Sequence, residues 1–356
     1  MKTTSPANSL GIAVIGAGNI ARFHARAIQD LEGAHLAGLY SDIPEMTRKL
    51  AGAFGVPAFH ELDAVLDHPG IGAVTIATPS GTHADLGIAA ARAGKHVMCE
   101  KPLDITLERI DRLIAACAES RVQLGAVFQS RFGPGARAVH RIVRAGWLGR
   151  RTVCNAQIKW WRTQQYYDSG GWRGTWELDG GGALMNQGIH AIDLLVWMCG
   201  LPAAVAAFAE TLAHERIQVE DAAVAALRWE DGAVGWIEGT TAAYPGYAKR
   251  LELSGDRGSV VLEDDRIVTL DVAERAAEAQ ELRAQLGAAS TVGGGASDPL
   301  AIDYTGHKLQ FQDFVDAIRE ARPPAVHGRE ARQAVALILA IYRAARGGAR
   351  IDPRSL

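Results

Sequence analysis

Glu100, Lys101 and Pro102 place an acid, a base and a proline directly after a short apolar run at residues 96–99. The run predicts a buried strand, and in an open parallel sheet ligands bind beyond the carboxyl ends of the strands. A lysine at such an end can donate a hydrogen bond to a substrate oxygen and stabilise the negative charge that develops on it. The alternative is a solvated loop lysine, so Lys101 needs a partner to count as catalytic.

The second set of candidates lies on a predicted helix over residues 183–198, which is otherwise almost entirely apolar. Four side chains share one stripe of this helix because they recur at helical spacing; they are Asn186, His190, Asp193 and Trp197. Polar groups on a buried helix need partners. Two interpretations stay open: a core histidine satisfied by Asp193, or a pocket wall in which His190 accepts a proton and Asp193 tunes it.

A glycine-rich turn predicts a dinucleotide site. The run Gly16-Ala17-Gly18-Asn19-Ile20-Ala21 follows an apolar strand at residues 11–15 and opens a helix at 21–31. In this G-x-G-x-x-A pattern Gly16 makes the turn, Gly18 lets a pyrophosphate approach the backbone, and Ala21 lets helix and strand pack closely. The amides around Gly18, Asn19 and Ile20 then form the anion site. A merely structural turn is the alternative.

The residue that ends the second predicted strand indicates which dinucleotide binds. Residues 35–40 form that strand, and Asp42 follows it about 20 positions after the glycines. A carboxylate there accepts hydrogen bonds from the adenine-ribose hydroxyls and repels a 2′-phosphate. No arginine follows Asp42 directly, so the sequence favours NAD over NADP, although Arg48 lies in the next helix.

Alternating strands and helices predict a doubly wound parallel sheet in a domain of residues 1–128. Further strands are expected at residues 71–77 and 96–99, with what we count as a sixth at 122–127, and helices at 84–93 and 106–120. The loop after the strand at 71–77 is expected to line the cofactor cleft; its candidates are Thr78, Pro79, Ser80, Thr82 and His83. Gln129 follows the last strand.

Residues 129–356 predict a second, α/β domain with a large and mostly antiparallel open sheet. Strands are expected at residues 151–161, 205–212, 221–229, 234–241, 250–254 and 259–262, and helices at 135–145, 309–321 and 329–345. The loop after the first of these strands is rich in planar side chains that suit sugar faces or, alternatively, a partner subunit; it includes Trp161, Arg162, Trp172 and Arg173. Residues 273–298, part helix and part loop, receive no chemical role.

Composition narrows the class of ligand. The chain is 48% hydrophobic and 22% charged, with a net charge of −3 and no basic block, which argues against nucleic acid and membrane partners. The four cysteines lack metal-binding or disulfide spacing and predict reduced thiols of a cytoplasmic protein. We expect no bound metal. The polar residues 1–9 do not predict a signal peptide, and the apolar stretch 334–345 is too short to span a bilayer.

Together, the glycine turn, the run Glu100-Lys101-Pro102 and the pattern Gly188-Ile189-His190-x-x-Asp193 resemble the Gfo/Idh/MocA family of NAD(P)-dependent oxidoreductases, named after glucose-fructose oxidoreductase and inositol dehydrogenase. The resemblance extends to the closing segment at residues 306–311. It implies a Rossmann domain, an open-sheet domain that often assembles as a homodimer or homotetramer, and a Lys101 and His190 that face the nicotinamide.

One departure from the family bears on the substrate. Inositol dehydrogenase-like members carry an aspartate four residues before the histidine, whereas this chain has Asn186, which cannot relay a proton. Asparagine at this position resembles the family's sugar-nucleotide members.

The expected activity is therefore NAD-dependent oxidation of a secondary hydroxyl on a sugar, sugar acid or cyclitol ring. A UDP-sugar 3-dehydrogenase and a non-enzymatic NAD sensor are the alternatives. His190 and Lys101 would act on the hydroxyl. Glu100, Lys101, Gln129, Trp161 and Arg162 would border the cofactor. The expected substrate contacts are Lys101, Trp172, Arg173, Asn186, His190 and His307.

Overall fold

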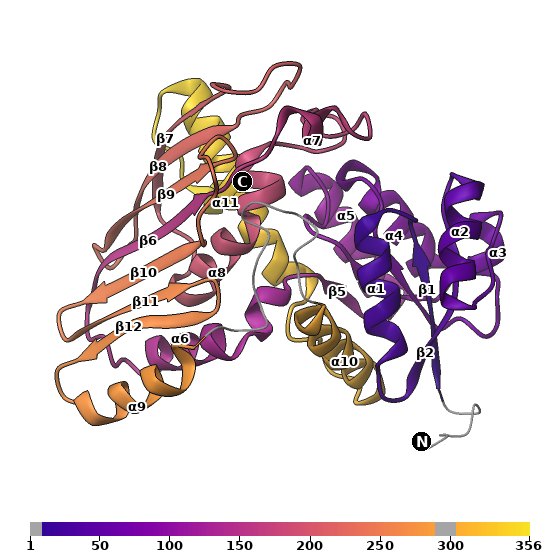
Figure 1. Ribbon diagram of the computed structural model, residues 1–356, viewed down its shortest axis with the longest axis horizontal. Coiled ribbons are helices and arrows are strands. Elements are labelled where there is room, and N and C mark those ends of the chain that lie inside the picture. Colours follow the sequence, from indigo (N-terminus) through magenta and orange to yellow (C-terminus); the bar gives the residue numbers. More distant parts are fainter. Residues whose placement is uncertain (1–8, 289–303) are drawn as a thin grey trace. The chain divides into compact units, whose positions relative to one another are not determined.

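The chain folds into two compact units in a computed structural model that describes residues 9–288 and 304–356. The first unit consists of the described residues up to Gln129 together with Tyr304–Arg332, and the second of Ser130–Asp303, within the described part, together with Gln333–Leu356. Figure 1 shows the helices and strands of both. The segment 304–332, which the sequence analysis assigned to the second domain, packs with the first unit.

The first unit is built on a parallel sheet of five strands in the order β2-β1-β3-β4-β5. The strands are β1 (Leu10–Ile15), β2 (Ala34–Tyr40), β3 (Ala73–Ile76), β4 (His96–Cys99) and β5 (Leu124–Ala126). The predicted fold class is confirmed, and each of these strands matches one of the predicted ranges, which number five, so the count of six strands is wrong.

Helices cover both faces of this sheet. They are α1 (Asn19–Gln29), α2 (Pro44–Phe54), α3 (Leu62–Leu66), α4 (His83–Arg92), α5 (Leu107–Glu119) and α10 (Thr305–Arg319). The last of these comes from the far end of the chain, and its Phe311 and Phe314 are buried in one core cluster with Ile12 and Val14 of β1. Burial of such large apolar side chains, roughly 2 kcal/mol each, holds α10 in the first unit.

The second unit contains a sheet of seven strands in the order β12-β11-β10-β6-β9-β8-β7. The strands are β6 (Arg151–Lys159), β7 (Ala204–Glu210), β8 (Ala222–Arg228), β9 (Val234–Thr240), β10 (Arg250–Gly255), β11 (Gly258–Glu263) and β12 (Arg266–Val272). Neighbours run antiparallel except β6 and β9, which are parallel. The sequence analysis did not single out β12.

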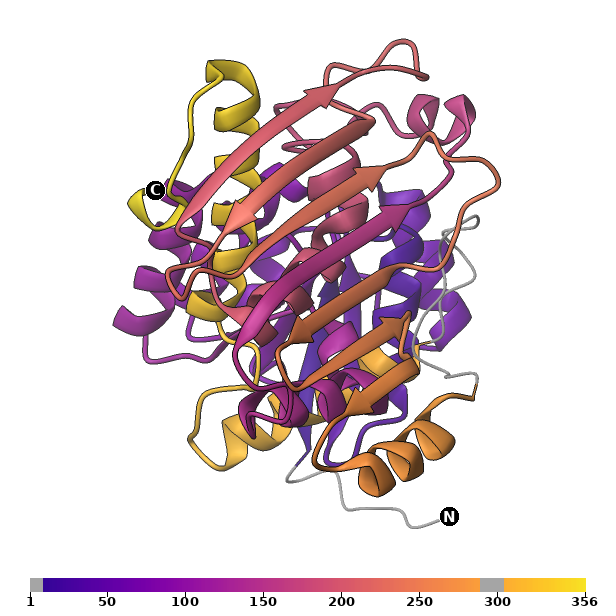
Figure 2. The same cartoon turned by 90° about the vertical axis from the view of Figure 1, so that its left-hand side faces the viewer.

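Helices cover one face of the large sheet and leave the other open (Figure 2). The helices of this unit are α6 (Pro134–Arg144), α7 (Gln164–Asp168), α8 (Ile189–Cys199) and α9 (Ala276–Leu286), and α11 (Gly328–Gly347) enters it from the first unit. Strand residues alternate between the faces. On β8, for example, Ala223, Ala225 and Leu227 are buried, whereas Val224 is exposed.

The predicted helix at residues 183–198 is not a single α-helix. Residues Ala183–Gly188 form a π-helical turn, and the α-helix begins only at Ile189. Asn186 therefore lies on wider helical turns than His190 does, so the stretch between them is not the continuous α-helix that the sequence analysis expected. Such π-helical turns are rare and frequently occur at functional sites.

The predicted N-terminal segment and the predicted loop at residues 273–298 are described only in part. Residues 1–8, and the part of the predicted loop from residue 289 onward, lie outside the described residues. Among the described helices none is long and apolar enough to cross a membrane. The four cysteines are buried and form no disulfide.

Candidate active site

Three adjacent parallel strands of the first unit end at the same edge and carry the predicted cofactor residues there. Strand β1 lies between β2 and β3. After β1 the chain crosses to β2 on one side, whereas after β3 it crosses to β4 on the other side. The crevice at such a switch point is the usual ligand site of this fold. Gly16 follows β1, Thr78 follows β3, and Lys101 follows β4.

The glycine turn fits a pyrophosphate. A Cβ added at Gly16 would lie 2.4 Å from the carbonyl oxygen of Ala77, so the turn requires glycine. A Cβ added at Gly18 would meet no described atom within 4 Å, so space is open in front of its backbone. Helix α1 begins at Asn19, and no side chain of the described residues caps its first amides. These amides are available to an anion.

Acidic side chains surround the position predicted for the adenine ribose. Asp42 is exposed after β2. Burial, followed by the charges of Asp42, Glu61 and Asp63, raises the pKa of Tyr40. Negative charge gathered here disfavours a 2′-phosphate, which is consistent with NAD.

His83 holds together two loops that were predicted to line the cofactor cleft. Its Nδ1 lies 2.7 Å from the carbonyl oxygen of Pro102 and its Nε2 lies 2.8 Å from that of Thr78. Because His83 is only 1% exposed, its visible role is to position these loops. Thr78 and Thr82 are linked by a 2.8 Å hydrogen bond, Pro79 is partly exposed beside them, and Ser80 is buried.

Glu100 anchors the segment that presents Lys101. One carboxylate oxygen lies 2.9 Å from Nε2 of His24 on α1, and the other accepts the backbone N–H of Lys101 at 2.9 Å. Burial raises the pKa of Glu100, but the hydrogen bond and charge of His24, with His307 and Lys101, outweigh burial and lower it to about 2. Glu100 thus remains a carboxylate, and Lys101 itself is partly exposed.

His307 belongs to this buried cluster of the first unit. Its Nε2 lies 3.9 Å from the Glu100 carboxylate, and its side chain is 1% exposed. His24, Glu100 and His307 have a ligand set that could in principle hold a metal. However, His24 already bridges Glu100 and the Thr75 hydroxyl, at 2.9 Å each, so hydrogen bonding accounts for its position.

In the second unit, the proposed catalytic stripe is where the buried helix is partly accessible. Asn186, His190 and Trp197 are partly exposed, while nearly every other residue from 181 to 199 is buried. The sequence prediction placed these residues on one face, and their shared exposure is consistent with a surface that faces a ligand.

A chain of hydrogen bonds orients the Asn186 amide. Its Nδ2 donates to Asp179 at 2.5 Å, and its Oδ1 accepts from Nε2 of Gln187 at 2.9 Å. Gln187 in turn accepts from Arg162 at 2.7 Å and donates to the Tyr166 hydroxyl at 2.8 Å. A carboxylate therefore lies beside the Asn186 amide, and it belongs to Asp179.

Asp193 has a partner that the sequence did not reveal. Arg131 donates two hydrogen bonds to its carboxylate, and both side chains are at least 95% buried. The Arg131 guanidinium also lies over the Trp197 ring, 5.3 Å from its centroid, and His140 stacks on that ring at 3.9 Å. The Trp197 end of the stripe is thus packed against α6.

Aromatic side chains and guanidiniums interleave in the loop that follows β6. Arg162 is 3% exposed and lies over the rings of Trp160 and Tyr166. Arg173, which is partly exposed, lies 5.0 Å from the Tyr166 centroid and 4.8 Å from that of Trp172. Arg162 is therefore buried against the aromatic rings, whereas Trp172 and Arg173 are accessible enough to contact a ligand.

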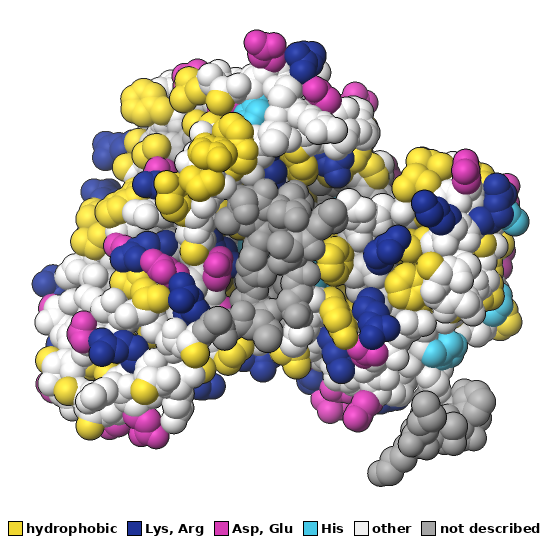
Figure 3. Space-filling view, in the orientation of Figure 1, with side chains coloured by type: hydrophobic (Ala, Val, Ile, Leu, Met, Phe, Trp, Pro, Cys, Tyr) yellow, Lys and Arg dark blue, Asp and Glu magenta, His cyan; other side chains and the backbone are white. Residues whose placement is uncertain are grey.

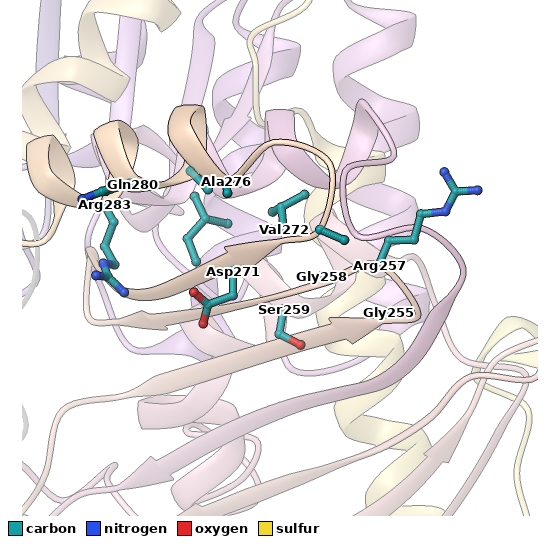
Figure 4. A pocket seen from close by; sticks show the side chains of 12 residues that line it. Gly255, Arg257, Gly258, Ser259, Asp271, Val272, Ala276, Gln280 and Arg283 are labelled. Carbon is teal, nitrogen blue, oxygen red and sulfur yellow. The ribbon is translucent and has the colours of Figure 1, made fainter.

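A separate cavity of about 710 Å³ lies elsewhere in the second unit, between α9 and the strands β11 and β12 (Figure 4). In this view Arg257 points away from the residues on α9. None of the residues predicted to bind cofactor or substrate lines this cavity; its lining includes Ser259, Asp271, Val272, Ala276, Gln280 and Arg283.

Several residues that organise the site were not predicted from the sequence. They are His24, Arg131, Asp179 and Gln187. Gln187 could have been suspected because it is a polar residue on a buried helix next to Asn186. The others lie seven or more positions from the residues they contact and carry no periodic signal.

Gln129, which was predicted to border the cofactor, is partly exposed just beyond β5.

Comparison with known proteins places both halves of the chain in one group. Residues 10–128 match the oxidoreductase family with an NAD-binding Rossmann fold, and residues 136–261 match the GFO/IDH/MocA C-terminal domain. Inositol 2-dehydrogenase of Rhizobium meliloti strain 1021 is 27% identical over 340 residues, which cover 93% of this chain and 95% of that enzyme.

Levoglucosan dehydrogenase of Pseudarthrobacter phenanthrenivorans is 29% identical over 65% of each chain. The crystal structure of WlbA dehydrogenase from Bordetella pertussis, in complex with NADH and UDP-GlcNAcA, has a TM-score of 0.88 and 34% identity over 97% of this chain and 98% of that one.

Proposed function

Because this chain belongs to the GFO/IDH/MocA family of oxidoreductases, we propose that it is an NAD-dependent dehydrogenase of a secondary hydroxyl on a sugar, sugar acid or cyclitol ring. The observation that carries the proposal is the accessible stripe on an otherwise buried helix, with His190 at its centre and Asn186 held in a fixed orientation beside it. The relatives named above act on inositol and levoglucosan, which supports a polyhydroxylated ring as substrate.

In the proposed mechanism His190 accepts the hydroxyl proton, and Lys101 donates a hydrogen bond to the same oxygen as alkoxide-like charge develops. Asn186, Trp172 and Arg173 orient the ring, and Asp193 fixes the helix that carries His190. Bound NAD would supply the acceptor for the hydride that leaves the adjacent carbon. The residues that would hold it are Gly16, Gly18, Asn19, Ile20, Asp42 and the loop from Thr78 to His83.

The test is a panel of free sugars, cyclitols, sugar acids and sugar nucleotides, offered with NAD or NADP while NADH or NADPH absorbance is followed. We expect turnover with NAD on at least one ring. Lys101→Ala should reduce kcat by a factor of about 10²–10³ and leave the Kd for NAD nearly unchanged. Lys49→Ala, which removes an exposed lysine from α2, is the matched control. Wild-type turnover by Lys101→Ala would refute the assignment of Lys101.

A nucleotide-linked substrate is the second candidate, because two observations favour it. Asn186 stands where the inositol-type members have aspartate, and the chain is 34% identical to a dehydrogenase whose structure contains UDP-GlcNAcA. Preferential oxidation of a UDP-sugar in the same panel would show that the substrate is nucleotide-linked. Tight NAD binding without oxidation of any ring would instead favour a cofactor sensor.

We also propose that the open face of the large sheet joins copies of the chain into a homodimer or homotetramer. Phe208 pairs with Val224 across β7 and β8, and both are exposed, by 79% and 52%. Trp236 lies on the same face of β9 and is 36% exposed. Figure 3 views the sheet along its edge and shows hydrophobic side chains at the border where β7, β8 and β9 lie in Figure 1. An apolar sheet face of this kind is typical of a protein interface.

We propose a cytoplasmic location. The supporting observation is that all four thiols are buried and free of disulfides. Burial raises the pKa of Cys117 to about 12, which keeps this thiol protonated and unreactive. Activity in the cytosolic fraction of the source cell, and its absence from the secreted fraction, would test this location.

A further inference from the structure

A run of three glycines leads into the π-helical turn that carries Asn186. A Cβ added at Gly182 would lie 1.8 Å from the backbone oxygen of Glu220, and one added at Gly181 would lie 2.3 Å from the Tyr342 hydroxyl. The glycines therefore allow the backbone of Glu220 and the side chain of Tyr342 to lie directly against the chain at this point. The proposed mechanism assigns no role to either Glu220 or Tyr342.

Glu220 satisfies the first backbone donors of the π-helical turn. One carboxylate oxygen accepts the N–H of Gly182 at 2.9 Å, and the other accepts that of Leu184 at 2.8 Å. The backbone oxygen of Glu220 accepts the N–H of Ala183 at 3.0 Å. Three consecutive amides, which a helix start leaves without helical partners, thus bind one residue.

Tyr342 of α11 fixes the carboxylate itself. Its hydroxyl donates to Glu220 at 2.8 Å, and both side chains are at least 95% buried. The backbone N–H of Asn186 donates to the carbonyl oxygen of Gly182 at 3.0 Å. A continuous chain of hydrogen bonds runs from Tyr342 through Glu220 and Gly182 to the backbone of Asn186.

We propose that Glu220, held by Tyr342, is a positioning residue that sets the backbone of the π-helical turn and so places the Asn186 amide for substrate. The proposal rests on the proposed function, because it assigns Asn186 to the substrate site. It differs from a general stabilising role because it is local to Gly182–Asn186. The α-helix from Ile189 onward makes its own backbone hydrogen bonds and does not need the carboxylate.

The ionisation of Glu220 is consistent with this role. Burial raises the pKa of Glu220 to about 7, although the hydrogen bonds from Leu184, Gly182 and Tyr342 lower it. The charge of Glu220 helps to raise the pKa of Tyr167, and the charge of Asp179 helps to raise the pKa of Tyr342.

The test uses hydrogen exchange of the full chain, read by mass spectrometry in peptides that cover residues 180–188. In Glu220→Gln the side-chain NH₂ must face at least one of the N–H donors, so the local hydrogen bonds are lost. We expect exchange in these peptides to accelerate about tenfold or more, because local opening there becomes easier. Tyr342→Phe removes a single donor and should produce a smaller change in the same peptides.

Asp265→Asn is the matched control. Asp265 is also buried and accepts a helix-start amide, that of Ala136 at 2.8 Å, but α6 carries no proposed catalytic residue. This variant should leave exchange in 180–188 unchanged. In the activity assay, Glu220→Gln should reduce kcat by a factor of about 10–100, because small displacements of a catalytic group are costly, with an unchanged Kd for NAD.

Unchanged exchange in 180–188, or loss of protection spread equally over the whole chain in Tyr342→Phe, would overturn the proposal, as would a kcat within twofold of the wild type in Glu220→Gln. If Glu220→Gln does not fold, Tyr342→Phe decides alone by the same two criteria. If no ring is oxidised by the wild type, the proposed function fails separately, and the exchange result still decides whether Glu220 sets this turn.

Discussion

Arg131 holds Asp193 by two hydrogen bonds of 2.7 Å, from Nε and from a terminal nitrogen, and both side chains are buried. Because the pair is desolvated, removing one charge leaves the other without compensation. Asp193→Asn should therefore lower the free energy of unfolding of the second unit by about 3–5 kcal/mol.

Urea unfolding followed by tryptophan fluorescence measures this loss selectively, because all eight tryptophans lie in the second unit. Asp168→Asn is the control, since it breaks the exposed pair of Asp168 with Arg216, 2.9 Å apart, and should change the midpoint little. An equal shift in both variants would show that burial of the Arg131 pair does not govern its contribution.

The pH dependence of stability should carry a contribution from Glu100. Its folded pKa of about 2 lies below the ordinary glutamate value of 4.5, so the ionised form is stabilised by folding. At about 1.4 kcal/mol per pKa unit, this contributes about 3 kcal/mol above pH 4.5, which is lost as the pH falls from 4.5 towards 2.

Glu100→Gln should thus be less stable than the wild type at pH 7, and the gap should narrow as the pH approaches 3. Circular dichroism during urea unfolding follows both units, while tryptophan fluorescence reports the second unit alone and provides an internal reference. Glu119→Gln, at an exposed position on α5, should leave stability unchanged. A gap that stays constant with pH would contradict the lowered pKa.

Cofactor preference should depend on Asp42. Asp42→Ala removes the carboxylate that would bind the ribose hydroxyls and repel a 2′-phosphate. We expect the ratio of kcat/KM for NADP to that for NAD to rise about tenfold or more, which corresponds to about 1.4 kcal/mol.

Asp63→Asn removes one charge from the same acidic group and should change this ratio less, since Asp63 lies on α3 and not directly after β2. A larger effect at Asp63 than at Asp42 would move the ribose site away from the end of β2.

Asn186→Asp should impair the enzyme. The new carboxylate would lie beside that of Asp179, which is now 2.5 Å from the Asn186 amide nitrogen. Two carboxylates this close share a proton, and the pKa of one rises. Stability relative to the wild type should fall as the pH rises from 5 to 8, measured by thermal unfolding, and turnover at pH 8 should decrease.

The double variant Asp179→Asn with Asn186→Asp exchanges the two groups and restores one amide and one carboxylate. It should recover most of the lost stability. If Asn186→Asp alone is as stable as the wild type at every pH, the two side chains are not held together.

Assembly should depend on the open face of the sheet. Phe208→Asp introduces a charge that cannot be buried between two apolar sheets without a large desolvation cost. Size-exclusion chromatography with light scattering should show the oligomer of the wild type shifted to a monomer. Met46→Asp, at a position on α2 of the first unit that is 42% exposed, should leave the mass unchanged. A monomeric wild type would refute the interface.

The residues that the sequence identified share a local signature. The Gly16 turn, Asp42 and Lys101 were found because each follows a recognisable apolar strand, and strand ends in a parallel sheet meet at one edge. His190 was found because a polar side chain on a buried helix stands out. Backbone conformation and burial pattern are encoded in near neighbours along the chain, which is why the fold class and the order of the elements could be predicted.

The tertiary structure decided which donor meets which acceptor. His24 is 76 positions from Glu100, Arg131 is 62 from Asp193, and Tyr342 is 122 from Glu220. It also decided that the helix before His190 begins as a π-helical turn, since the amides of that turn bind a carboxylate 36 to 38 positions away. The sequence by itself determined where chemistry could occur, because strand and helix periodicity is local. Only packing between distant elements determined how each reactive group is held, because a buried polar atom can bind whichever complementary atom the fold brings beside it.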